Sequence, residues 1–124
     1  MPTAFKVSIF SRWAKKCGLD DAALNRAVKE MEDGLIDAQL GGGLVKKRIA
    51  VGSSGKRGGA RVIVATNFCG RWFFLYGFEK NERDNIDTRE MKALQIAAAA
   101  LLKMDGASIK KALALQHIEE IHHE

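Results

Sequence analysis

The chain has 124 residues, of which 47% are hydrophobic and 28% charged, and its formal net charge is +5. This length suits one domain with a single hydrophobic core, which we expect to span residues 1–124. The longest apolar run, Ile96 to Leu102, is too short to cross a bilayer, and the N-terminus lacks the apolar core of a signal peptide. Cys17 and Cys69 are far apart in the sequence and form no CxxC motif. We therefore expect two buried thiols in a reducing compartment. We therefore expect a cytoplasmic protein with no membrane partner.

The charges are segregated along the chain. Residues 1–19 carry cations and no acid, whereas residues 20–40 carry six acids against two cations. Residues 44–61 again contain no carboxylate and hold six cations: Lys46, Lys47, Arg48, Lys56, Arg57 and Arg61. Such a run is typical of a surface that binds nucleic acid. It is equally typical of a solvated strand edge that avoids pairing with other chains, and the run alone does not separate the two interpretations.

The first 43 residues predict one strand and two helices. The apolar segment 4–10 is a strand, Ser11 begins a short helix that Gly18 ends, and Asp20 caps the second helix. The second helix has one apolar stripe, formed by Leu24, Val28, Met31 and Leu35. Gly41 to Gly43 are expected to form a flexible join.

Three strands with short connections are predicted next. Residues 44–49 alternate between apolar and basic side chains except at Lys47. Residues 61–68 are rich in β-branched side chains, and residues 71–78 are rich in aromatic ones. We expect an antiparallel meander with the N-terminal strand at one edge. The aromatic strand could offer bases a stacking surface, but burial in the core is the favoured interpretation.

Asp87 and Glu90 have the spacing of a capping box at the start of a long helix. Asp105 and Gly106 break that helix, and residues 105–124 are expected to form a C-terminal extension whose last part, 117–124, is either frayed helix or a short strand. The predicted fold class is therefore α+β: a small antiparallel sheet packed with two N-terminal helices and a C-terminal helix.

Several kinds of site are disfavoured by the residues. The segment Gly52 to Lys56 lacks the first glycine and the final Ser or Thr of a phosphate-binding loop, since Ala50 and Arg57 stand there. The histidines, which all fall in the terminal tail (His117, His122, His123), have no i,i+4 pair to face a metal ion. We expect no metal and no cofactor, so an enzyme here would work with Lys and Arg.

Three motifs together resemble the RelE/ParE superfamily of bacterial toxins, especially its HigB-like branch. They are LVKKRIA at 44–50, GKRGGAR at 55–61, and YGFEKNER at 76–83 followed by Asp84, Asn85 and Ile86, and the resemblance covers about residues 4–104. It implies a RelE-like fold. It also implies the toxin of a type II toxin–antitoxin module that cleaves mRNA on the ribosome and so inhibits translation.

The resemblance assigns catalytic roles to five cations: Lys46, Arg48, Arg61, Lys80 and Arg83. Lys46 or Lys80 would transfer protons, while the three arginines would hold the phosphate without a metal. Lys47, Lys56 and Arg57 would contact RNA without taking part in chemistry. Ala60 and Asn81 depart from the family pattern, and no tyrosine lies near the start of the last helix, so the general acid stays open.

The implied partners are the ribosome, mRNA and a cognate antitoxin, expected to be a helix-turn-helix DNA-binding protein. Two alternatives stay open from the sequence. One is a ParE-like toxin that binds DNA gyrase without nuclease activity, and the other is a non-catalytic RNA-binding module.

Overall fold

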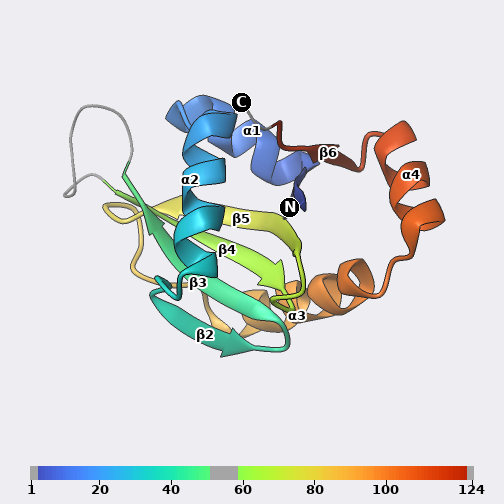
Figure 1. The fold of residues 1–124 in the computed structure, drawn as a ribbon. Helices are drawn as coiled ribbons and strands as arrows, with labels where there is room; N and C mark the ends of the chain where they lie inside the picture. The colour runs from blue at the N-terminus through green and yellow to red at the C-terminus, as the bar shows by residue number, and fades with distance from the viewer. Residues whose placement is uncertain (1–2, 51–58, 123–124) are drawn as a thin grey trace.

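The computed structural model describes residues 3–50 and 59–122. In these parts the chain forms four helices and six strands, in the order β1 (Thr3–Val7), α1 (Ser8–Cys17), α2 (Asp21–Glu32), β2 (Ala38–Gly41), β3 (Leu44–Ile49), β4 (Ala60–Thr66), β5 (Arg71–Glu79), α3 (Thr88–Leu102), α4 (Gly106–Ala114) and β6 (Ile118–Glu120) (Figure 1). The α+β class expected from the sequence is confirmed. Of the helices in the described segments, none is long and apolar enough to cross a membrane.

The strands form one sheet in the order β2-β3-β4-β5-β1-β6. The predicted meander of β3, β4 and β5 is confirmed, and β1 lies parallel to β5. As expected, β1 joins the meander at one edge, beside β5; the short strand β6 then pairs with its other side, so β1 is not the outermost strand of the whole sheet. The expectation of a flexible join at Gly41 to Gly43 is wrong: β2 pairs with β3, and Gly42 and Gly43 make the turn at φ 63° and 86°, which glycine adopts without a steric cost.

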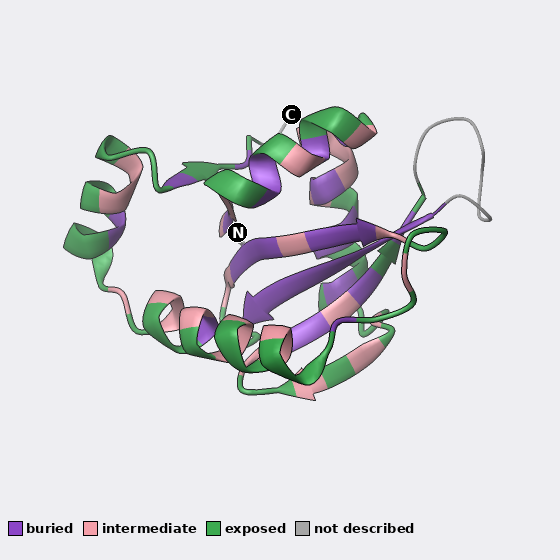
Figure 2. Ribbon diagram, turned by 180° about the vertical axis from the view of Figure 1, so that it is seen from behind, coloured by how far each residue is buried: buried purple, intermediate pink, exposed green. Residues whose placement is uncertain are grey.

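Helices pack on both faces of the sheet, and every residue of the central strand β4 is buried (Figure 2). We name the two faces after the helices that cover them. The α2 face packs against α1 and α2 through Leu24, Val28 and Met31, whereas the α3 face packs against α3. Leu35, the fourth member of the predicted stripe, is 59% exposed because α2 ends at Glu32.

The helix starts follow local hydrogen bonds. The carboxylate of Asp20 accepts the N–H of Ala23 at 2.9 Å, and Asp87 and Glu90 form the predicted capping box at the start of α3. Helix α1 begins at Ser8 rather than Ser11, so the strand predicted over residues 4–10 stops at Val7.

The aromatic strand is part of the core, as predicted: Trp72, Phe73 and Phe74 are each at most 1% exposed. The expectation of a buried thiol is wrong for Cys69, which is exposed. It lies in the tight β4–β5 turn, where the side-chain oxygen of Asn67 accepts its N–H.

A β-bulge changes the direction of the side chains in β5. Ile63 pairs with Tyr76 and Val64 with Phe74, so Leu75 is an extra residue on β5. After the bulge, Tyr76 and Phe78 pack on the α3 face together with Leu75. Gly77 is turned the other way and lies against the indole ring of Trp13 in α1.

We predict that Gly77→Ala destabilises the protein by about 1–3 kcal/mol, because a core already filled resists added volume. A Cβ at this position would lie 2.3 Å from Cζ3 of Trp13. Gly106→Ala is the matched control, since no atom lies within 4 Å of its added Cβ. Urea unfolding measures both variants, and equal stability of the two would contradict the packing of Trp13 on Gly77.

Candidate active site

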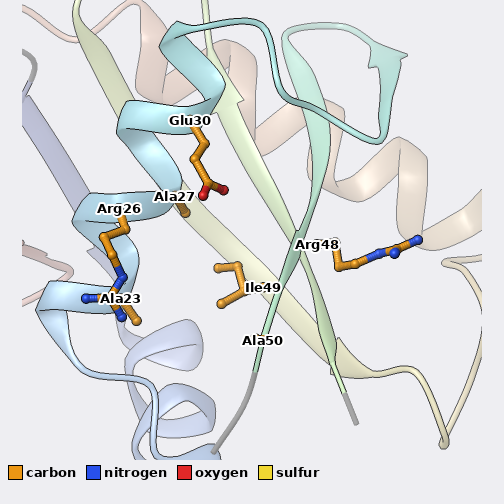
Figure 3. A pocket seen from close by; sticks show the side chains of 7 residues that line it. All are labelled: Ala23, Arg26, Ala27, Glu30, Arg48, Ile49 and Ala50. Atoms are coloured by element: carbon orange, nitrogen blue, oxygen red, sulfur yellow. The ribbon is translucent and has the colours of Figure 1, made fainter. Parts of the chain in front are cut away.

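Two rows of side chains cross the α3 face of β3, β4 and β5. The first row is Lys46, Ile63 and Tyr76, and the second is Arg48, Arg61 and Phe78. Leu44 packs in the α3 core and Val45 in the α2 core, so the alternation of β3 directs Lys46 and Arg48 to the α3 face. Figure 3 shows the side chain of Arg48 extending away from α2.

The second row is followed by Arg83, whose guanidinium carbon lies 5.5 Å from the centre of the Phe78 ring. The structure therefore brings four cations to one face at one end of the sheet. We call this group the basic patch: Lys46, Arg48, Arg61 and Arg83.

Arg61 is a buried cation within the patch. Only 8% of the residue is exposed, and its Nε lies 3.2 Å from Oδ2 of Asp37. Asp37 is held at this place because its N–H donates to the carbonyl of Lys46 at 2.8 Å. Nη1 of Arg61 is buried and has no hydrogen-bond partner among the residues described. Asp37 thus fixes the arginine while leaving part of its donor capacity unused.

Arg83 is held by three groups: Glu90 in the first turn of α3, Tyr76 on β5, and Asn85 in the segment before α3. Its Nη1 donates to Oε2 of Glu90 at 3.0 Å and to the hydroxyl of Tyr76 at 3.4 Å, and its Nη2 donates to Oε1 of Glu90. Its Nε donates to the carbonyl of Asn85 at 3.0 Å. These bonds use four of the five N–H donors of the guanidinium group, so its flat faces and one N–H are the parts left available.

The neighbours of Arg83 change how two groups titrate. Its hydrogen bonds to Glu90, followed by the backbone N–H of Asp87, lower the pKa of the Glu90 carboxyl to about 2. Burial, followed by the charge of Glu90, raises the pKa of the Tyr76 hydroxyl. Near neutral pH, Glu90 is therefore ionised and Tyr76 is protonated, so Tyr76 has a proton that it can donate.

Lys46 and Arg48 differ from the two other cations of the patch. Among the acidic side chains of residues 3–50 and 59–122, none lies within 4.0 Å of their charged nitrogens. Arg48 is exposed and Lys46 half-buried. These two side chains therefore supply the positive charge that is not already neutralised.

The remaining candidates are not among the four cations of the basic patch. Lys47 points to the α2 face, where its Nζ lies 2.8 Å from Oε1 of Glu30 and its side chain is 9% exposed. Lys80 is exposed one residue beyond β5, and its N–H donates to the carbonyl of Gly59 at 3.1 Å. The other two predicted RNA contacts, Lys56 and Arg57, lie outside the described residues.

Sequence reasoning missed Asp37, Glu90 and Tyr76 as members of the site. The sequence predicts Glu90 only as half of a capping box. It predicts Tyr76 to be buried in the core, like the other aromatic residues of its strand. The sequence did contain one signal for Asp37: it belongs to the acidic stretch 20–40, which comes just before the basic run 44–61. No group of three or more His, Cys, Asp or Glu side chains in the described part of the chain could hold a metal ion.

The fold and the basic patch place the protein in a general class. It is a small α+β protein whose sheet carries cations from adjacent strands on one face. A family model described as the RelE toxin of the RelE/RelB toxin–antitoxin system matches residues 3–121. The chain belongs to this family, and membership implies an antitoxin of the RelB type as its partner. No match was found among curated proteins.

We predict that Glu90→Gln weakens the protein near neutral pH but not in strong acid. A carboxyl whose pKa falls from 4.5 to about 2 on folding contributes stability above pH 4.5, and this contribution is lost as the pH falls towards 2. Unfolding free energies at pH 6 and pH 2 test this, with Glu32→Gln on α2 as the control. A deficit that persists unchanged at pH 2 would contradict the ion pair as its cause.

Proposed function

We propose that the protein is a ribosome-dependent endoribonuclease that cleaves mRNA without a metal ion. The observation that supports this most is the row of Arg48 and Arg61 beside Lys46, which places three cations on neighbouring strands of one face. Adjacent strands lie about 4.8 Å apart, so side chains in such rows can reach one phosphate group. The assignment to a HigB-like branch stays a prediction.

The reaction needs the ribose 2′-hydroxyl to lose a proton, attack the neighbouring phosphorus and expel the 5′-oxygen. Arg48 and Arg61 would stabilise the negative charge that grows on the phosphorane oxygens. Lys46 or Lys80 would transfer protons, and the ribosome would supply part of the substrate's orientation.

The two carboxylates suggest different roles for Arg61 and Arg83 in the proposed site, because Asp37 pairs with Arg61 and Glu90 with Arg83. Asp37 fixes Arg61 before RNA arrives, which reduces the cost of ordering that side chain around a phosphate. Arg83 would have to exchange Glu90 for a phosphate, so we place it at the margin of the reacting group. Tyr76, protonated beside Arg83, is the nearest hydroxyl to this margin and adds a candidate for the open role of general acid.

Mapping of mRNA 5′-ends after induction in cells tests the proposed activity. Wild-type protein is expected to produce cuts on translated messages only, and Arg61→Ala to reduce them by roughly 10²-fold because a transition-state contact is lost. Intact messages with DNA damage would instead support gyrase binding, and intact messages without growth arrest would support a non-catalytic RNA-binding module.

A pair of neighbouring lysines gives a sharper test. We predict that Lys46→Met lowers cleavage by at least tenfold, whereas Lys47→Met leaves it within about threefold, because Lys47 points to the α2 face and bonds to Glu30. Both substitutions keep an unbranched side chain, so packing changes little. In vitro cleavage of mRNA on programmed ribosomes measures both, and equal losses would contradict the division of the two faces.

A further inference from the structure

A cleft of about 500 Å³ lies beside the basic patch, where β5 continues past the end of β1. Strand β1 pairs with β5 only as far as Phe74, because the chain turns into α1 at Ser8. Helix α1 therefore lies along the rest of β5 in place of a strand, and the space between them is the cleft. Its volume falls within the ~300–1,000 Å³ that is usual for sites of small ligands.

One wall of the cleft is the indole ring of Trp13. The ring lies on Gly77, where any Cβ would collide with it, and its centre is 5.5 Å from that of the Phe10 ring. These contacts fix the orientation of the indole, while the residue stays half-buried and lines the cleft. A fixed aromatic ring beside an open space is a surface on which a planar group can stack.

Arg83 lines the other side of the cleft. Its guanidinium carbon lies 5.5 Å from the centre of the Phe78 ring, and Glu90, Tyr76 and Asn85 accept hydrogen bonds from its nitrogens. About one third of the side chain is nevertheless exposed. The hydrogen bonds in the structure use four of its five N–H donors, so what Arg83 chiefly offers a ligand is a flat cationic group, which stacks well on a nucleobase.

Glu82 adds an acceptor to the lining. Its charge reaches across to α1: after burial, Glu79 and Glu82 raise the pKa of the Cys17 thiol, one helical turn from Trp13. A carboxylate accepts hydrogen bonds and donates none, so it suits the amino group of adenine, cytosine or guanine. It repels the two carbonyl oxygens of uracil and also a phosphate.

We propose that the cleft binds one base of the single-stranded RNA substrate, stacked on Trp13 and Arg83 with its amino group towards Glu82. This proposal rests on the proposed function, because it is the position of the cleft beside the basic patch that selects RNA. Phe78 lies under Arg83 and directly opposite Arg61 in the second row, so the base site is one strand away from the phosphate site. A nucleotide neighbouring the cleaved bond would occupy it.

Tryptophan fluorescence tests the base site, since the chain has two tryptophans and Trp72 is buried. Adenosine 5′-monophosphate is expected to quench the emission and to bind at least tenfold more tightly than ribose 5-phosphate, which lacks the base. Equal affinities would overturn the proposal. Trp13→Phe should remove the quenching, and quenching that persists in this variant would also overturn it.

Two exposed isoleucines provide a matched pair. Ile9 lines the mouth of the cleft and is 60% exposed, whereas Ile96 is 73% exposed on α3 and does not line it. Ile9→Glu should weaken binding of adenosine 5′-monophosphate at least tenfold, and Ile96→Glu should leave it within twofold. A similar effect of both substitutions, or no effect of either, would overturn the proposal.

Glu82→Gln tests the selectivity without touching the core, because Glu82 is exposed. Wild-type protein should prefer adenosine over uridine 5′-monophosphate at least fivefold, and the variant should reduce this preference to within twofold, since an amide can also donate. An unchanged preference would remove Glu82 from the site. The trinucleotide ApApA should bind at least fivefold more tightly than adenosine 5′-monophosphate, and equal affinity would make the cleft a site for free nucleotides.

Arg61→Ala separates this inference from the nuclease activity. It should reduce mRNA cleavage by roughly 10²-fold yet leave the affinity for adenosine 5′-monophosphate within twofold, because Arg61 does not line the cleft. If the wild-type protein binds the base but cuts no RNA, the proposed function is wrong and the base site is retained. If the wild-type protein cuts RNA but binds no base, the base site is wrong and the proposed function is retained.

Discussion

The bulge at Leu75 decides which side chains of β5 face the basic patch. Without the bulge, a Leu75 paired in regular alternation would turn Phe78 to the α2 face and Gly77 to the α3 face. With it, Phe78 becomes the surface on which Arg83 rests, and Gly77 receives the ring of Trp13. The bulge thus places both Phe78 beside Arg83 at the edge of the patch and Gly77 against Trp13 at the cleft.

The patch is less positive than its four cations suggest. Asp37 neutralises Arg61 and Glu90 neutralises Arg83, while Lys46 and Arg48 have no such partner among the described acids. Burial explains the first pair, because a guanidinium that is 8% exposed has lost most of its hydration, and a nearby carboxylate offsets part of that cost. Arg83 is more exposed, so its bidentate pair with Glu90 serves to orient the guanidinium rather than to compensate for burial.

Much of the fold followed from local sequence signals, because hydrophobic periodicity and capping residues act over a few residues. The capping box of Asp87 and Glu90, the cap at Asp20 and the three-strand meander were predicted correctly. Strand β2 was not predicted, and β6 was only one of two alternatives for residues 117–124, since each strand depends on a partner strand elsewhere in the chain. A three-residue strand such as β6 carries almost no periodic signal, and its pairing with β1 is a tertiary contact.

The same distinction applies to the site. Alternation along β3 separates Lys46 and Arg48 from Lys47, and this could be read from the sequence once the strand was recognised. The counter-charges could not, because Asp37 reaches Arg61 across β3 and Glu90 reaches Arg83 through the start of a helix. Spacing along a chain reports which face a side chain takes, but ion pairs between elements depend on how those elements pack.

Arg83 connects the patch and the cleft through two properties that a lysine would not combine. Its nitrogens donate to Glu90, Tyr76 and Asn85, while the same flat group lies over Phe78 and lines the cleft. An ammonium group could replace the ion pair but has no planar face to offer a base. The geometry therefore requires arginine at this position for its shape as much as for its charge, and a loop following a bulged strand is what brings that shape to the edge of the sheet.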